Sequence, residues 1–251
     1  MKLKYTIIGL TLLLSGCSYL NPFLYFQGDV GDKSTMPVAI EELIEMAEYC
    51  EAAYRSANEE NKLYEIRSNE FSYHVKQDSG VTILIFRGTD NTKNVLTDID
   101  LRPWQDDELD MKLHRGFRDA AALLLVDIKK KYKLEKTIYL TGHSLGGAIA
   151  QIAGLWLNLD DYEVQIYTFG SPKVTPTFFG NDPPHYRVII DSDPVPFVPP
   201  YPYVHSGIMI NAETLEWAEG GEAIRGSFTE INDQDHSITY YLKTLRRWKD
   251  W

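Results

Sequence analysis

The hydrophobic pattern alternates between two periods from residue 36 onward. Apolar side chains recur every three or four residues over 40–54, 117–132 and 237–248, which predicts amphipathic helices, and the longer apolar stretch 145–157 predicts a buried helix. Shorter apolar runs predict strands, and these are residues 71–76, 81–86, 137–141, 164–169 and 186–190. Strands that alternate with helices indicate an α/β fold with a mostly parallel central sheet and helices on both faces.

The chain of 251 residues divides into three parts. Residues 1–16 combine Lys2 and Lys4 with a short apolar run, which is the pattern of a secretory signal peptide. That run is too short to span a bilayer as a helix. Residues 17–35 have no sustained period and contain proline and glycine, which suits a tether. We therefore expect a single folded domain over residues 36–251, a usual size for an α/β fold.

The end of the signal peptide carries a recognisable motif. Leu14-Ser15-Gly16-Cys17 resembles the lipobox of bacterial lipoproteins, in which the cysteine is lipidated and becomes the first mature residue. The resemblance implies a lipidated Cys17 and a catalytic domain outside the cytoplasm, held in the bacterial cell envelope. Ser18 suits the outer membrane if the organism is Gram-negative. The alternative is a plain secreted protein with a chance cysteine at this position.

The formal charge of −11 excludes one class of partner. Nucleic-acid binding needs clustered Lys and Arg to displace phosphate counterions, so we expect no nucleic-acid partner. Negative charge also opposes adsorption to anionic lipid, and a covalent lipid anchor overcomes this. Cys17 and Cys50 are the only cysteines, so lipidation of the first leaves no disulfide. Cys50 has helical spacing with Leu43 and Ala47, which predicts a buried filler.

Gly142-His143-Ser144-Leu145-Gly146 fits the pattern G-x-S-x-G. An apolar strand ends at this motif and an apolar helix begins after it, which is the strand-turn-helix of a nucleophile elbow. The small flanking residues leave room for a strained serine at the tip of a sharp turn. Ser144 is thus the candidate nucleophile, and the amide of Leu145, at the helix N-terminus, is a candidate oxyanion donor. The alternative without a catalytic role is a serine in a glycine-rich loop.

A serine nucleophile needs a basic histidine and a carboxylate that orients it, and in this fold the acid precedes the histidine. Three histidines follow the motif: His185, His205 and His236. His236 lies in a polar loop before the final helix, where it can reach the edge of the sheet or remain exposed to solvent. Asp191 and Asp193 both follow the predicted strand 186–190, and their spacing does not separate them.

Several further motifs follow one another over roughly residues 70–240. In chain order they are Phe86-Arg87-Gly88-Thr89, His114-Arg115-Gly116-Phe117, GHSLGGA at 142–148, Thr168-Phe169-Gly170-Ser171-Pro172, Asp193-Pro194-Val195-Pro196, Tyr203-Val204-His205-Ser206-Gly207 and Asp235-His236. In order and spacing they resemble the motifs of the class 3 lipase family, which includes fungal extracellular lipases. The resemblance implies an α/β-hydrolase fold. It also implies that Asp193 is the triad acid, with Asp191 as runner-up, and that His236 is the base.

The same resemblance assigns supporting roles. It implies that the amide of Thr89 is the second oxyanion donor, that Arg87 is a structural ion-pair partner and that His205 is a structural neighbour of the site. An aspartate late in segment 90–100 would hold the Thr89 hydroxyl; Asp98 fits best, and Asp90 and Asp100 compete. This segment, where a lid helix is expected, has only three large apolar side chains. The acidic residues 106–110 beside it suit a solvated loop and would repel anionic lipid, so we expect weak interfacial activation.

These residues predict a serine carboxylic-ester hydrolase that acts on lipid acyl esters, as a triacylglycerol lipase or esterase, through a Ser-Asp-His triad. One alternative is phospholipase A1-type activity on membrane phospholipid, and another is a lipid-binding lipoprotein that keeps the fold without catalysis. A protease would use the same chemistry. We expect no metal or organic cofactor, a lipid or small ester as substrate, membrane contact through the anchor, and a monomer.

Overall fold

The computed structural model describes residues 30–55, 64–66, 69–89, 102–220 and 234–249. Eight strands form the central sheet, in the spatial order β1-β2-β3-β6-β7-β8-β9-β10. The strands are β1 (Tyr64–Ile66), β2 (Asn69–Asp78), β3 (Val81–Arg87), β6 (Thr137–His143), β7 (Glu163–Phe169), β8 (His185–Ile189), β9 (Ile208–Asn211) and β10 (Trp217–Glu219). A separate hairpin pairs β4 (Pro103–Asp106) with β5 (Met111–His114).

The middle of the sheet is parallel and its edges are antiparallel. Strands β3, β6, β7, β8 and β9 pair in parallel, whereas β1, β2 and β10 pair antiparallel with their neighbours. The register sets Phe86 opposite Gly142 and Gly142 opposite Thr168. The carboxyl ends of three neighbouring strands therefore meet along one edge, which is where α/β folds place their sites.

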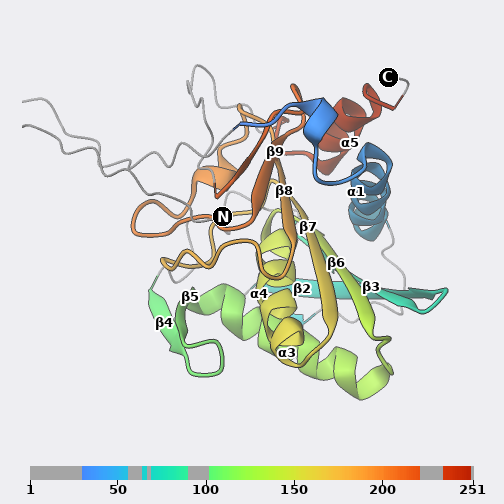
Figure 1. The fold of residues 1–251 in the computed structure, drawn as a ribbon. Helices are drawn as coiled ribbons and strands as arrows, with labels where there is room; N and C mark the ends of the chain where they lie inside the picture. Colours follow the sequence, from blue (N-terminus) through green and yellow to red (C-terminus); the bar gives the residue numbers. More distant parts are fainter. Residues whose placement is uncertain (1–29, 56–63, 67–68, 90–101, 221–233, 250–251) are drawn as a thin grey trace, which may run out of the picture.

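Helices cover both faces of the sheet (Figure 1). One face carries α3 (Arg115–Lys131) and α4 (Leu145–Leu159), and the other carries α1 (Ile40–Arg55) and α5 (Ile238–Arg246). A hydrophobic core lies on each face of the sheet, and β3 contributes side chains to both. Leu84 and Phe86 pack with α3 and α4, while Ile83 and Ile85 pack with α1 and α5. Each such buried side chain contributes about 1.5–3 kcal/mol of hydrophobic stabilisation. The predicted parallel sheet with helices on both faces is confirmed.

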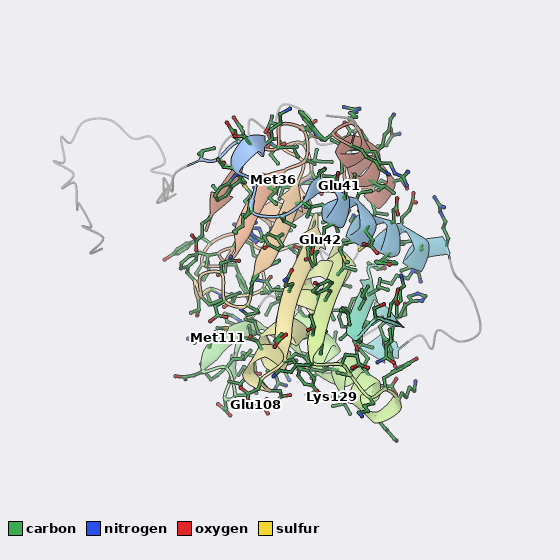
Figure 2. All side chains as sticks on the ribbon, turned by 45° about the vertical axis from the view of Figure 1, so that its right-hand side comes forward. Met36, Glu41, Glu42, Glu108, Met111 and Lys129 are labelled. Atoms are coloured by element: carbon green, nitrogen blue, oxygen red, sulfur yellow. The ribbon has the colours of Figure 1, made fainter. Side chains whose placement is uncertain are left out.

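Helix α1 joins the sheet through its buried stripe. Cys50 is buried in that stripe, as its spacing predicts, and its Sγ lies 3.2 Å from the hydroxyl of Thr141 in β6. Glu42, in the first turn of α1, accepts a hydrogen bond from the hydroxyl of Tyr167 in β7. Figure 2 shows Glu41 and Glu42 in the upper half of the molecule and Lys129 at its lower end. Among the described residues, no helix has the length and apolarity needed to cross a membrane.

The prediction that residues 106–110 form a solvated loop is wrong for the first of them, Asp106. Asp106 is buried and its carboxylate accepts hydrogen bonds from the Leu109 amide at 3.0 Å, Arg118 Nε at 3.0 Å and Trp156 Nε1 at 3.3 Å. The paired partners offset the cost of burying this charge. Asp107, Glu108 and Asp110 are exposed at the tip of the β4–β5 hairpin, as predicted.

Some predictions fall outside the described residues. The signal peptide, Cys17 and the tether up to residue 29 lie outside them, as does segment 90–101 with Asp90, Asp98 and Asp100. Close to the start of the described chain, Gly31 forms an antiparallel bridge with Trp217 of β10. The described part of the N-terminal segment therefore contacts the edge of the sheet.

Candidate active site

Ser144 occupies a sharp turn between β6 and α4. Its φ of 57° and ψ of −129° lie in a region that a residue with a Cβ rarely adopts. Glycine is required on both sides because the chain is crowded: a Cβ at Gly142 would lie 2.2 Å from the carbonyl oxygen of Gly146, and a Cβ at Gly146 would lie 2.0 Å from that of Phe86. The predicted nucleophile elbow is thus present in its steric detail.

The turn places Ser144 beside the end of the neighbouring strand β7. Its amide donates to the carbonyl oxygen of Phe169, at the end of β7, at 2.9 Å. Leu145 is the first residue of α4, so its amide is among the helix N-terminal donors that have no acceptor within the helix. The helix dipole adds positive potential at this end. Negative charge that develops beside Ser144 would therefore be stabilised there.

The end of β3 passes directly beside the serine. A Cβ at Gly88 would lie 2.7 Å from the His143 carbonyl oxygen and 3.3 Å from the Ser144 Cβ. Thr89, the next residue in the chain, is partly buried. Arg87, the last residue of β3, has its guanidinium 5.4 Å from the centre of the Tyr54 ring. The second oxyanion candidate is therefore at the edge where Ser144 lies.

Asp193 and His236 form a buried pair. The Nδ1 of His236 lies 2.8 Å from Oδ2 of Asp193, and the same oxygen accepts a hydrogen bond from the Tyr241 hydroxyl at 2.6 Å. The other carboxylate oxygen of Asp193 accepts the Val195 amide at 2.9 Å. Three donors hold a carboxylate that has no solvent exposure. Its position and its ability to orient a histidine are both fixed by these contacts.

Gly170 makes room for this pair at the end of β7. Its φ is +56°, and a Cβ here would lie 2.6 Å from Oδ2 of Asp193 and 3.1 Å from Nδ1 of His236. Gly170 directly follows Phe169, whose carbonyl oxygen accepts the Ser144 amide. The last residue of β7 and the glycine after it therefore contact the serine turn and the acid–histidine pair, respectively.

The second ring nitrogen of His236 is available as a base. Its Nε2 is buried and makes no hydrogen bond to any residue that the structure describes. In the neutral ring that donates Nδ1–H to Asp193, Nε2 is the nitrogen without a proton. The described residues contain no Ser144–His236 hydrogen bond, and such bonds are often long before substrate binds. A neutral imidazole in this position can accept a proton from a neighbouring hydroxyl.

The other candidates lie in other environments. Asp191 accepts a hydrogen bond from the Asn211 amide group at 2.9 Å. Nε2 of His205 donates to the carbonyl oxygen of Pro196 at 2.6 Å, and Nε2 of His185 lies 3.0 Å from the Thr168 hydroxyl. Burial lowers the pKa of both these histidines well below the ordinary value, helped by the nearby Arg187 cation. The geometry therefore favours Asp193 over Asp191 and His236 over the other two.

Sequence reasoning missed three side chains around the site: Tyr241, His143 and Tyr54. Tyr241 is buried, and its pKa is raised well above the ordinary value, first by burial and then by the Asp193 carboxylate, so it stays a donor. Its place in the apolar stripe of the final helix indicates only core packing. His143 lies within the motif, but the pattern gives it no role, and nothing in the sequence links Tyr54 to the site. Within the described ranges no group of three or more His, Cys, Asp or Glu side chains could hold a metal ion.

A parallel sheet with a strained serine at the β6–α4 turn and a buried acid–histidine pair beside it defines the serine hydrolases of the α/β-hydrolase fold. Comparison with known proteins narrows this class. A family model described as "Lipase (class 3)" matches residues 83–203. Over these residues the chain is similar to the class 3 lipase family, as its motifs predict.

Individual relatives agree with this assignment. The chain is 32% identical over 153 residues to a secreted mono- and diacylglycerol lipase of Fusarium solani, covering 55% of this chain and 44% of that protein. It is 30% identical over 205 residues to a lipase of Rhizopus niveus, covering 71% of this chain and 50% of the relative. The chain therefore spans about half the length of these curated relatives.

The solved structures share the fold. The crystal structure of a lipase from Rhizopus microsporus var. chinensis matches with a TM-score of 0.61 at 22% identity, covering 90% of this chain and 96% of that one. Lipase II from Rhizopus niveus gives the same TM-score at 21% identity, with 78% and 92% covered. The α/β-hydrolase fold is thereby confirmed.

Proposed function

We propose that this protein is a serine carboxylic-ester hydrolase that acts on lipid acyl esters, with Ser144 as nucleophile, His236 as base and Asp193 as acid. One observation carries the proposal: a histidine whose Nδ1 is 2.8 Å from a buried carboxylate keeps its Nε2 without a partner among the described residues, at the sheet edge that bears the strained serine. The family supports the same chemistry, since the relatives named above are lipases.

The reaction follows from these positions. Ser144 Oγ attacks the ester carbonyl carbon while His236 Nε2 takes the hydroxyl proton, and the amides of Leu145 and Thr89 donate to the oxyanion. The intermediate collapses when the C–O bond to the alcohol breaks and His236 returns the proton to the leaving oxygen. Water then gives a proton to His236 and attacks the acyl-enzyme. The bond between the acyl carbon and Ser144 Oγ breaks, His236 returns the proton to Oγ, and the carboxylic acid and the free serine are released. Asp193 keeps the imidazole in the required tautomer and stabilises its charged form throughout.

The substrate class rests on the relatives and on the anchor. Relatives are named as lipases and as secreted mono- and diacylglycerol lipases, which supports glycerides and shorter esters first. Phospholipid hydrolysis of the A1 type is the second candidate, because a lipidated Cys17 would hold the enzyme at a bilayer. We place the domain outside the cytoplasm, in agreement with relatives that are secreted, and in the bacterial envelope if the anchor is present.

The central test compares the full-length protein with Ser144→Ala. Both are assayed on p-nitrophenyl esters from acetate to palmitate, on a triglyceride emulsion and on a phospholipid. We expect hydrolysis by the native chain, loss of at least about a thousandfold in Ser144→Ala, and a chain-length profile that separates esterase from lipase. Equal background rates for the two proteins would refute catalysis and favour the lipid-binding alternative.

Two further measurements address the alternatives. Fluorophosphonate labelling at Ser144 is expected for any serine hydrolase and would exclude a non-catalytic lipid-binding protein. A peptide substrate tests the protease alternative, and we expect no cleavage. For the anchor, Cys17→Ser should release the protein from the membrane fraction; retention of this variant at the membrane would argue against lipidation.

A further inference from the structure

His143, the second residue of the elbow motif, has both ring nitrogens engaged. Its Nε2 lies 2.6 Å from the main-chain carbonyl oxygen of His236, and its Nδ1 lies 2.9 Å from the hydroxyl of Tyr54 in α1. The rings of His143 and His236 face each other with centroids 4.6 Å apart and an interplanar angle of 34°. A single side chain thus connects helix α1 to the main chain of the proposed base.

We infer that His143 and Tyr54 form a positioning pair that fixes the main chain of His236 and so aims its Nε2 toward Ser144. This inference rests on the proposed function, since it assigns roles relative to the proposed base. Neither residue touches the reacting atoms. Their effect on catalysis passes through the orientation of His236.

The direction of both hydrogen bonds follows from donor chemistry. A carbonyl oxygen can only accept, so Nε2 of His143 carries the proton and donates to His236. The neutral ring then has a free lone pair on Nδ1, which accepts the Tyr54 hydroxyl proton. The hydrogen bonds therefore run in one direction: Tyr54 donates to His143, and His143 donates to the main chain of His236.

The surroundings of His143 favour its neutral form, which the two hydrogen bonds from Tyr54 and to His236 require. Complete burial, and then the nearby His236 ring, lower the pKa of His143 well below its ordinary value. The other groups that face it are the Tyr54 ring at 5.7 Å and the Tyr241 ring at 6.1 Å between centroids, with Arg87 beyond Tyr54. A second proton would place a charge in this buried space and remove the acceptor for Tyr54.

The two ends of His236 are therefore held from different directions. Asp193 holds the ring at Nδ1, and His143 holds the main chain at the carbonyl oxygen. With the carbonyl released, the ring could pivot about its bond to Asp193 and carry Nε2 away from the serine. A displacement of about 1 Å at a reacting group can cost about a hundredfold in rate. Because His143 directly precedes Ser144, one backbone turn determines the positions of both partners of the proton transfer.

The experiment uses the full-length protein and the kinetics of p-nitrophenyl butyrate hydrolysis. His143→Leu removes both bonds, and we expect kcat to fall about a hundredfold while KM changes less than about threefold. His143→Gln keeps a donor for the carbonyl oxygen and should recover at least about tenfold of that loss. Tyr54→Phe removes only the outer donor and should lower kcat by about three- to tenfold.

A matched control lies two residues earlier on the same strand. The Thr141 hydroxyl is buried and contacts α1 through the Met46 carbonyl oxygen at 3.3 Å and Cys50. Thr141→Val therefore removes a buried polar contact between β6 and α1 without touching His236. We expect it to lower stability while kcat stays within about twofold of the native value.

A double-mutant cycle separates positioning from a general structural role. In a His236→Ala background the ring to be aimed is absent, so His143→Leu should leave the residual rate unchanged within about twofold. A further hundredfold loss in that background would overturn the inference. So would a native-like kcat in both His143→Leu and Tyr54→Phe. If His143→Leu fails to fold, the Gln and Phe variants carry the test, and equal kcat for both with the native protein is the overturning result.

The same experiment distinguishes the hydrolase activity from the positioning role of His143 and Tyr54. A native protein that hydrolyses no ester and takes up no fluorophosphonate would overturn the hydrolase proposal and, with it, the positioning role. A native protein that is active and labelled, with His143 variants that behave like Thr141→Val, would leave the hydrolase standing and overturn the positioning role alone.

Discussion

The two halves of the site are held in place by different kinds of force. The nucleophile half is a continuous piece of chain, in which β6 turns into α4 and crowding by main-chain atoms requires glycine at 142 and 146. The acid–base half joins Asp193 and His236, which are 43 residues apart, through side-chain hydrogen bonds in a buried space. One half depends on the shape of the backbone and the other on polar pairing.

The difference implies opposite sensitivities. The nucleophile half should tolerate little added volume, because the nearest atoms are main-chain carbonyls that cannot move aside. Apart from the crowded position of Gly170, the acid–base half should tolerate modest changes of shape and respond strongly to the loss of a donor or acceptor. Substitutions that change only one of these properties test the comparison directly.

The largest effect is expected from Asp193→Asn, which keeps the shape and changes the pairing. An amide in place of the carboxylate can stabilise the wrong tautomer of His236 and cannot stabilise the charged ring. We expect kcat for ester hydrolysis to fall about ten thousandfold, as for the corresponding change in a serine protease triad. Circular dichroism and the unfolding midpoint should stay close to native. A loss of less than tenfold would contradict the triad role and reopen the case for Asp191.

Gly146→Ala makes the reverse change, because it adds volume and leaves every polar side chain of the site unchanged. Its Cβ would lie 2.0 Å from the Phe86 carbonyl oxygen, so the β6–α4 turn has to shift. We expect the free energy of unfolding, measured by urea denaturation, to fall by about 3 kcal/mol.

Gly80→Ala is the control without crowding. Gly80 has a positive φ, +84°, unlike Gly146, and no atom lies within 4 Å of its Cβ position. Backbone strain alone should cost about 1 kcal/mol there. Equal losses in the two variants would mean that crowding does not determine the nucleophile half.

Tyr241→Phe tests a single bond of the acid–base half. It removes one of the three donors to Asp193, and the ring still fills the core. Loss of one hydrogen bond to a charged acceptor should lower kcat by about tenfold. Stopped-flow or steady-state assays of Tyr241→Phe against the native protein measure this, with Tyr240→Phe, on the less buried side of the same helix, as control. An unchanged kcat would show that the remaining donors suffice.

The smallest effect concerns the pH dependence of stability. Burial lowers the folded-state pKa of His143, His185 and His205 below the ordinary value of 6.5. As pH falls below about 6.5, the unfolded chain binds protons that the folded chain does not, so these residues lower the free energy of unfolding in acid. Their contribution is fully favourable above that pH and is lost as pH falls.

Each such histidine adds a slope of about 1.4 kcal/mol per pH unit. His205→Gln should therefore make the decline of stability between about pH 6 and pH 5 shallower by about that amount, as measured by denaturant unfolding at each pH. A slope identical to that of the native protein would indicate that His205 titrates normally in the folded state.

The difference between the two halves also explains why the sequence predicted the nucleophile half better than the acid–base half. Ser144 and its glycines are neighbours in the chain, so the motif and the apolar runs on either side predict the turn, the strand and the helix together. Asp191 and Asp193 both follow β8, and only the distance to His236 distinguishes them. That distance depends on how α5 packs on the sheet, which no local pattern encodes. The family resemblance supplied the assignment that spacing alone did not.

Other omissions have the same cause. The stretch that forms β9, Ile208–Asn211, has only four residues, too few for a clear period, and it becomes a strand because β8 provides a partner. The acidic run from Asp106 to Asp110 has the composition of a solvated loop. Its first residue is buried because Arg118 and Trp156 reach it from other elements. Long-range pairing determines both outcomes.

The buried thiol of Cys50 offers a different use of the fold. Burial raises its pKa to about 12, so the folded protein presents almost no thiolate to an alkylating reagent at neutral pH. Cys17 is the only other cysteine, and lipidation would block it. A thiol reagent would then react when α1 transiently separates from β6, and the labelling rate would report the frequency of that opening. Tyr54 also lies in α1. The labelling rate of Cys50 would therefore also report how often the contact between Tyr54 and His143 is released.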